Sequence, residues 1–188
     1  MGALPKENRS FTYADYRDWE LAEGERYELI RGEAFAMAAP DERHQLILGE
    51  LFAQFHAFLR GKPCKVLPAP YDVRLFYGGD DCDDTVVQPD ITVVCDEKKR
   101  GSEGCRGAPD LVVEILSPSN RATEMERKLR LYRDAGVREY WVVNPEIGGV
   151  SVFSFGENLG FNVYKSGDVV PVAVLPGLSI PLDQVFEV

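Results

Sequence analysis

The chain has no run of about eighteen consecutive apolar residues, which excludes a conventional membrane-spanning helix. Residues 1–10 carry Lys6, Glu7 and Arg9 and have no apolar segment of the kind that a secretory signal needs, so we expect no such signal. The 188 residues are close to the usual size of one domain, and 45% of them are apolar. We therefore expect a single domain over residues 1–188, with one core.

Basic residues are scarce, because 21 lysines and arginines face 31 aspartates and glutamates and the net charge is −10. This deficit argues against a broad basic surface for nucleic acid and against long duplex DNA as a substrate. It does not exclude a nuclease whose acidic residues surround a metal ion.

The four cysteines, Cys64, Cys82, Cys95 and Cys105, include no C-x-x-C pair, so the sequence gives a zinc site little support. In the absence of a secretory signal, we interpret all four as free thiols in a reducing cytoplasm.

Hydrophobic periodicity and capping residues predict three helices, at 12–21, 40–59 and 122–135. Alternating or β-branched runs predict strands at 71–76, 86–94 (interrupted at Pro89), 111–116 and 139–144, and antiparallel strands between 149 and 181 with turns at Gly156 and Gly167. Residues 78–84 and 98–107 are typical of loops, the first acidic and the second charged and glycine-rich. The order of elements, with an apolar central strand, predicts an α/β (α+β) fold.

Residues 25–38 predict a tight hairpin that turns at Arg31-Gly32. In that register two pairs face each other across the hairpin, Ile30 with Glu33 and Glu28 with Phe35. Strand alternation then puts Glu28 and Glu33 on the same face.

Glu114 lies in the middle of the apolar run Leu111–Leu116 (LVVEIL). A carboxylate there is expensive to bury unless it is paired with a cation or bound to a metal. The alternatives to a metal site are a buried salt bridge to a nearby arginine or lysine, and a strand end that is open to water.

Asp90 follows Pro89 and precedes an apolar strand, which an ordinary turn aspartate would also do. Asp110 repeats the Pro-Asp pattern, but it lies about 13 Å from Glu114 along the same strand at roughly 3.3 Å per residue, too far to share one ion. Asp90 on a neighbouring strand can lie beside Glu114. Two such carboxylates form a hard oxygen site suited to Mg²⁺ or Mn²⁺, which activates water for phosphodiester hydrolysis.

Two more residues are candidates for the same site. Lys128 shares a helix face with Glu124 and Tyr132, and it could place a cation beside the attacking water, although a solvated Glu-Lys pair has the same spacing. His44 begins the apolar stripe of the 40–59 helix, where a histidine is either a structural donor or part of a site.

An ordered set of motifs extends over most of the chain. It consists of residues 27–33 (YELIRGE), His44, residues 88–91 (QPDI), residues 108–119 (APDLVVEILSPS), Lys128, Tyr132 and residues 136–143 (GVREYWVV). This set resembles the Uma-two family, a restriction endonuclease-like group within the PD-(D/E)XK nuclease superfamily.

The resemblance implies a restriction endonuclease-like core: a central mixed sheet flanked by helices, with additional antiparallel strands at both ends. It implies that Asp90 and Glu114 are the metal-binding acids and that the backbone carbonyl of Ile115 contacts the ion. The superfamily usually has a lysine two residues after the glutamate, where this chain has Leu116. In this family a lysine on the following helix is thought to substitute, and Lys128 matches that position.

The leading interpretation is a metal-dependent endonuclease in which Asp90 and Glu114 hold Mg²⁺ or Mn²⁺ and Lys128 orients the water. One of three residues would complete the site: Glu28, Glu33 or His44. The expected substrate is nucleic acid, with DNA as the first choice, and no membrane partner is expected.

Two other functions remain open. The first is a catalytically silent nuclease fold that serves as a binding or assembly module, which the net acidity and Leu116 favour. The second is a hydrolase of small phosphate compounds, which would have a tight pocket rather than an open groove. We also expect that Tyr140 and Trp141 supply an apolar surface for a homodimer, or else form an ordinary core pair.

Overall fold

The computed structural model describes residues 10–117, 122–156 and 159–187. Its main sheet has six strands in the order β12-β11-β10-β9-β6-β3. Their bounds are β3 Lys65–Pro68, β6 Ile91–Val94, β9 Leu111–Ile115, β10 Glu139–Asn144, β11 Gly149–Ser154 and β12 Gly160–Lys165. Strands β9 and β10 are parallel, and the other neighbours are antiparallel, so the sheet is mixed as expected.

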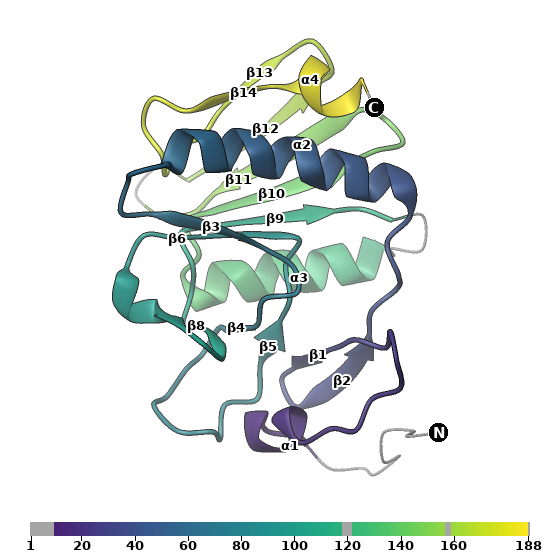
Figure 1. Cartoon of the computed structure of the whole chain (residues 1–188), viewed down its shortest axis with the longest axis vertical. Helices are drawn as coiled ribbons and strands as arrows, with labels where there is room; N and C mark the ends of the chain where they lie inside the picture. The colour runs from purple at the N-terminus through teal and green to yellow at the C-terminus, as the bar shows by residue number, and fades with distance from the viewer. Residues whose placement is uncertain (1–9, 118–121, 157–158, 188) are drawn as a thin grey trace.

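Two long helices cover the two faces of this sheet (Figure 1). Helix α2 (Glu42–Leu59) packs its apolar stripe against alternate residues of β9, including Val113. Helix α3 (Ala122–Ala135) packs on the opposite face, against Val112. The central strand β9 is therefore covered on both sides, which explains its almost continuous apolar sequence.

A second six-stranded sheet, in the order β2-β1-β5-β4-β8-β7, lies at the other end of the molecule (Figure 1). Its strands are β1 Tyr27–Ile30, β2 Glu33–Ala36, β4 Val73–Arg74, β5 Val86–Val87, β7 Arg100–Gly101 and β8 Gly104–Arg106; α1 (Tyr13–Arg17) and the 3-10 helix η1 (Glu97–Lys99) accompany them. The predicted hairpin is confirmed, since Ile30 pairs with Glu33 and Glu28 with Phe35. Its turn has positive φ at Arg31 and Gly32, as a two-residue hairpin loop requires.

Two local predictions need correction. The first helix ends at Arg17 rather than near residue 21. Residues 98–107 were interpreted as a loop, but they form η1 and the β7-β8 hairpin, because β8 finds a parallel partner in β4. The predicted break of the 86–94 strand at Pro89 is confirmed, and its two parts, β5 and β6, belong to different sheets. The predicted end of β9 at 117–120 lies, after Ser117, outside the described residues.

The C-terminal region adds β13 (Val169–Pro171) and β14 (Ser179–Pro181), which pair antiparallel as predicted. Helix α4 (Leu182–Phe186) follows and buries Leu182 and Val185 near α2. No helix in the described part of the chain is both long and apolar enough to cross a membrane.

Of the two alternatives for Tyr140 and Trp141, the structure supports core residues rather than an exposed apolar surface, because the two side chains are 1% and 0% exposed. Trp141 lies edge-on to Phe55 of α2, and Tyr140 packs against Tyr132 of α3. Successive residues of β10 therefore fill the two cores on either side of the main sheet.

The prediction of four free thiols is also wrong, since Cys64 and Cys95 form a disulfide. Cys64 directly precedes β3 and Cys95 directly follows β6, and these antiparallel neighbours pair Lys65 with Val94. The two cysteines are thus opposite each other at the end of the strand pair. Cys82 and Cys105 are free.

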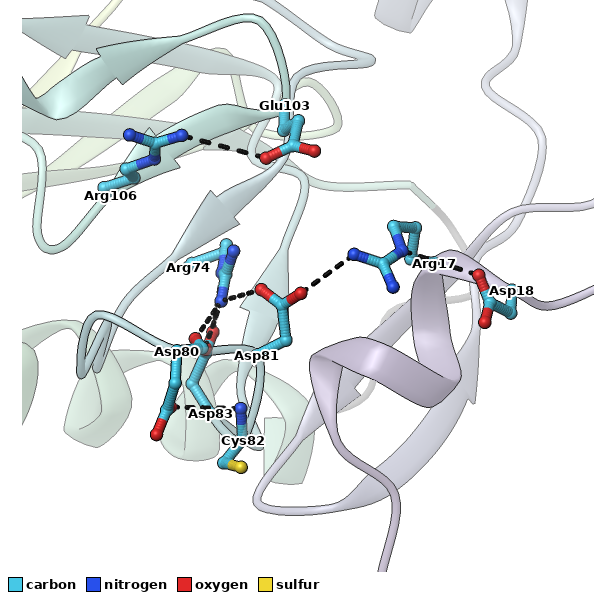
Figure 2. A network of polar contacts seen from close by, with 9 residues as sticks. All are labelled: Arg17, Asp18, Arg74, Asp80, Asp81, Cys82, Asp83, Glu103 and Arg106. Atoms are coloured by element: carbon cyan, nitrogen blue, oxygen red, sulfur yellow. Dashed lines mark hydrogen bonds and ion pairs between the residues drawn. The ribbon is translucent and has the colours of Figure 1, made fainter.

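The acidic loop at 78–84 folds around Arg74 (Figure 2). The Arg74 guanidinium donates to Asp83 and to Asp81, and it lies 3.6 Å from the centre of the Tyr13 ring. Arg17 of α1 donates to the other side of Asp81 at 2.8 Å. The acids of this loop therefore hold the N-terminal helix to the second sheet.

Candidate functional site

The main sheet brings Asp90 and Glu114 together. Strands β6 and β9 are antiparallel with Ile91 opposite Val113, so the next position in each strand places Asp90 opposite Glu114. The backbone N–H of Ile115 donates to Asp90 Oδ2 at 2.7 Å, which fixes the aspartate at the end of the strand pair. The two acids predicted from the sequence to form the site therefore lie opposite each other on adjacent strands.

Strand alternation decides which way Glu114 points. Val113 and Ile115 belong to the core under α2, whereas Val112 belongs to the core under α3. Glu114 therefore points toward α3, and its side chain is only 13% exposed.

Helix α3 supplies two hydrogen-bond donors to Glu114. Lys128 Nζ lies 2.9 Å from Glu114 Oε1, and the Tyr132 hydroxyl lies 2.5 Å from the same oxygen. Lys128 and Tyr132 are four residues apart, one helical turn, so both reach the same carboxylate. Lys128 is 7% exposed, which rules out the solvated surface pair that its spacing also permitted.

A third carboxylate comes from the hairpin. Glu28 on β1 is 3% exposed, and its Oε1 accepts hydrogen bonds from Lys128 Nζ at 3.0 Å and from the backbone N–H of Gln88 at 3.1 Å. Lys128 thus bridges Glu28 and Glu114. Glu33 is not part of this group: it is exposed, two register pairs nearer the turn, and lines a separate cavity.

The charges around Glu114 are unbalanced. Burial, followed by Glu28 and Asp90, raises the pKa of Glu114 to about 7, while Lys128 and the Tyr132 hydrogen bond act in the opposite direction. Burial would lower the pKa of Lys128, but Glu114 and Glu28 outweigh it and raise that pKa. Lys128 is therefore held charged, and one ammonium group offsets an excess of negative charge.

His44 reaches Asp90 from the other side of the sheet. Asp41 caps α2 by accepting from the His44 backbone N–H at 2.8 Å, and the His44 ring places Nε2 3.2 Å from Asp90 Oδ2. Burial alone would lower the pKa of His44, but the hydrogen bond and charge of Asp90 outweigh burial and raise it. His44 therefore positions the Asp90 carboxylate.

These residues line one cavity of about 410 Å³. The carboxylates, Lys128 and His44 form its polar part, and residues 36–40 together with Leu116 and Met125 form an apolar wall. Two contributors were not assigned from the sequence. Tyr132, which bonds Glu114, was noted for its spacing and as part of the motif set but was given no role, and Arg26 had no distinguishing pattern because its role depends on the hairpin register.

The carboxylate oxygens of the site fit a hard divalent cation as ligands. The hydrogen bonds from described residues fall on Asp90 Oδ2 and Glu114 Oε1, so within the described chain the second oxygen of each carboxylate has no such donor. Oxygens of this kind are the ligands that Mg²⁺ and Mn²⁺ prefer. Across residues 10–117, 122–156 and 159–187, no group of three or more His, Cys, Asp and Glu side chains could hold an ion.

A mixed sheet between two helices, with paired acids at the ends of adjacent central strands, defines a restriction endonuclease-like nuclease fold. A solved protein from Anabaena variabilis, described as a "putative nuclease" of the DUF820 group, has this fold. It matches 94% of this chain and 98% of its own with a TM-score of 0.74, at 20% identity. The predicted fold class is confirmed.

The chain belongs to the Uma2 family, because the model of that family, described as "Putative restriction endonuclease", matches residues 13–183. This confirms the resemblance drawn from the motifs. An uncharacterized protein of Synechocystis is 26% identical over 176 residues, which cover 92% of this chain and 90% of that protein. Family membership supports a nuclease-like function.

Proposed function

We propose that this protein is a metal-dependent endonuclease that hydrolyses phosphodiester bonds in nucleic acid, with DNA as the first substrate to test. The observation that carries the proposal is the placement of Asp90 and Glu114 on adjacent strands with Lys128 bonded to Glu114 in the same cavity. Membership of a family described as restriction endonucleases supports the same chemistry.

Asp90 and Glu114 would hold Mg²⁺ or Mn²⁺, with the Ile115 carbonyl as the backbone ligand that the family resemblance implies. Such an ion lowers the pKa of bound water and neutralises charge on phosphate oxygens. Ionised Glu114 is required for this, and Lys128 favours the ionised form against burial and the charges of Glu28 and Asp90.

The surrounding residues have distinct tasks in this proposal. Lys128 keeps its positive charge beside the carboxylates and can donate a hydrogen bond toward an attacking water or a phosphate oxygen. Tyr132 orients Glu114, and His44 with the Ile115 backbone N–H orients Asp90. The second oxygens of both acids are thereby left for ligands.

A second candidate function is a catalytically silent binding module. The observation that favours it is that Lys128 already bonds both Glu28 and Glu114, the closed arrangement of a structural ion-pair network. The residue after Ile115 is Leu116, so β9 itself supplies no lysine.

Cleavage assays on single-stranded and duplex DNA with matched Mg²⁺ and Mn²⁺ titrations separate these functions. Asp90→Asn, Glu114→Gln and Lys128→Met should each lose on the order of a hundredfold or more in rate. Lys98→Met is the matched control, because Lys98 is exposed in η1, and it should cleave like the parent. The assays are run at a temperature at which circular dichroism shows every variant to be folded.

Undiminished cleavage by Lys128→Met would remove Lys128 from the mechanism. If the parent protein cleaves no substrate with either metal, the endonuclease proposal fails and the silent module takes its place.

A further inference from the structure

Arg26 is a cationic side chain in the candidate cavity with no partner in the described part of the chain. It directly precedes β1, and its backbone carbonyl accepts from the Met37 N–H at 2.9 Å, which extends the hairpin register by one pair. Arg26 is two residues from Glu28 and therefore shares its face. It lines the cavity with the carboxylates, yet no described side chain bonds to its guanidinium.

Arg127 is a second cationic side chain beside the site, and no described carboxylate pairs with it. It directly precedes Lys128 on α3, and its Cζ lies 3.8 Å from the centre of the Phe35 ring. Its Nε is buried and has no hydrogen-bond partner among the described residues. Arg127 lines a second cavity of about 380 Å³ between the hairpin and α3, and Phe35 lines both cavities.

Other arginines of the second cavity lie beside carboxylates. Arg130 pairs with Glu126, and Arg31 lies 3.9 Å from Asp134. In a chain with a net charge of −10, two partly buried guanidinium groups that pair with no described carboxylate remain available to bind an anion. Arginine is the side chain best suited to phosphate, because its planar fork donates two parallel hydrogen bonds.

We propose that Arg26 and Arg127 form a phosphate-binding subsite around Phe35 that holds a single-stranded nucleic acid beside the scissile bond. The inference rests on the proposed function, since it assigns the substrate class of the same site. Arg26 would bind a phosphate in the main cavity, and Arg127 would bind the next phosphate along the strand in the second cavity.

The apolar wall favours a single strand over a duplex. Residues 36–40 have the sequence Ala-Met-Ala-Ala-Pro, and three of them, Ala36, Ala38 and Ala39, are exposed next to the carboxylates. Together with Phe35, this wall can contact unstacked bases, which a duplex keeps inside its stack. A long duplex would need many more cationic contacts than this acidic chain offers.

The test is direct binding in EDTA, so that cleavage is not needed for a signal. Fluorescence anisotropy with a labelled single-stranded oligonucleotide, and with the same sequence as a duplex, gives Kd over a range of salt concentrations. Arg26→Gln and Arg127→Gln should each raise Kd for the single strand about tenfold. Each should also reduce the slope of log Kd against log salt by about 0.7, the value for one contact to a single strand.

Two variants serve as controls. Arg133→Gln removes an exposed arginine of the same helix that lines neither cavity, and it should bind like the parent. Arg127→Lys keeps the positive charge near Phe35 and should retain the parent's salt slope. If Arg127→Gln does not fold, Arg26→Gln and Arg127→Lys still decide the question.

The subsite is overturned if the parent does not bind the single strand, if it binds the duplex more tightly, or if Arg26→Gln binds the single strand as the parent does. Weaker binding by the arginine variants supports it even if the parent cleaves nothing with Mg²⁺ or Mn²⁺, a result that would reject the proposed catalysis alone. Cleavage by a parent whose binding is insensitive to both arginines would reject the subsite alone.

Discussion

Replacing Lys128 by methionine removes the ammonium group that bonds both Glu28 and Glu114. The side chain is 7% exposed, and its two hydrogen bonds are 2.9 and 3.0 Å long. Methionine fills similar volume, so the main loss is the positive charge among three carboxylates, the third being Asp90. Removing one partner of a buried ion pair typically costs about 3–5 kcal/mol of unfolding free energy.

For a domain of this size, each 1 kcal/mol corresponds to roughly 2–4 °C in Tm. Lys128→Met should therefore lower the Tm of the metal-free protein by about 10 °C at pH 8. The effect should depend on pH. The pKa of Lys128 is raised, so its stabilising contribution is fully present at neutral pH and is lost only when the pH rises beyond the ordinary lysine range.

In Lys128→Met the carboxylates lose the charge that lowers the pKa of Glu114, so that pKa rises above its parent value of about 7. Protonation then relieves the repulsion, and the Tm deficit should shrink as the pH falls from 8 to 5.5. Thermal unfolding of parent, Lys128→Met and Lys98→Met in EDTA at both pH values measures this. A Tm of Lys128→Met within 2 °C of the parent at pH 8 would show that the Lys128 ammonium group does not stabilise these carboxylates.

Glu114→Gln should leave the metal-free protein as stable as the parent at pH 5 and make it more stable at pH 8, by at most about 3 kcal/mol. The pKa of Glu114 is raised from 4.5 to about 7, so the parent loses stability as the pH rises through that window. Urea unfolding at the two pH values measures this, and a Glu114→Gln variant less stable than the parent at pH 8 would contradict it. His44→Leu should weaken Mn²⁺ binding about 10–100-fold by freeing Asp90, whereas an unchanged affinity in calorimetry would show that the contact does not matter. Arg74→Met should cost about 3–5 kcal/mol in urea unfolding because it strands buried Asp83, and a loss below 1 kcal/mol would contradict that view of the loop.

Elements with a strong local pattern were predictable from the sequence. The 122–135 helix and the 139–144 strand have the bounds that their periodicity and the following Gly136 indicated. Glu114 was recognisable because a carboxylate interrupts an apolar strand. Its neighbour Asp90 was recognisable only together with Glu114, since a Pro-Asp pair alone has no fixed meaning.

Features that depend on long-range partners were not predictable. The β7-β8 hairpin exists because β8 pairs with β4, and nothing in the local composition of residues 98–107 encodes that partner. The Cys64–Cys95 disulfide follows from the register of β3 and β6, which no spacing rule gives. Helix α4 is five residues long, too short to establish a periodicity.

In the candidate site, too, some features followed from the sequence and others depended on long-range packing. The spacing of Glu124, Lys128 and Tyr132 was compatible with a solvated pair, and only the packing of α3 on the sheet buries Lys128 between two acids. Glu28 and Glu33 were equivalent by strand alternation. The register separates them, because Glu28 lies two pairs further from the turn than Glu33, where it bonds Lys128.

If Asp90 and Glu114 together hold a divalent ion, crystals soaked in millimolar Mn²⁺ will carry the ion between these two side chains. We expect an anomalous difference peak about 2.1 Å from an oxygen of each carboxylate, and no such peak in Asp90→Asn crystals treated in the same way. Parent crystals that diffract well and show no peak between these two residues at saturating Mn²⁺ would contradict it.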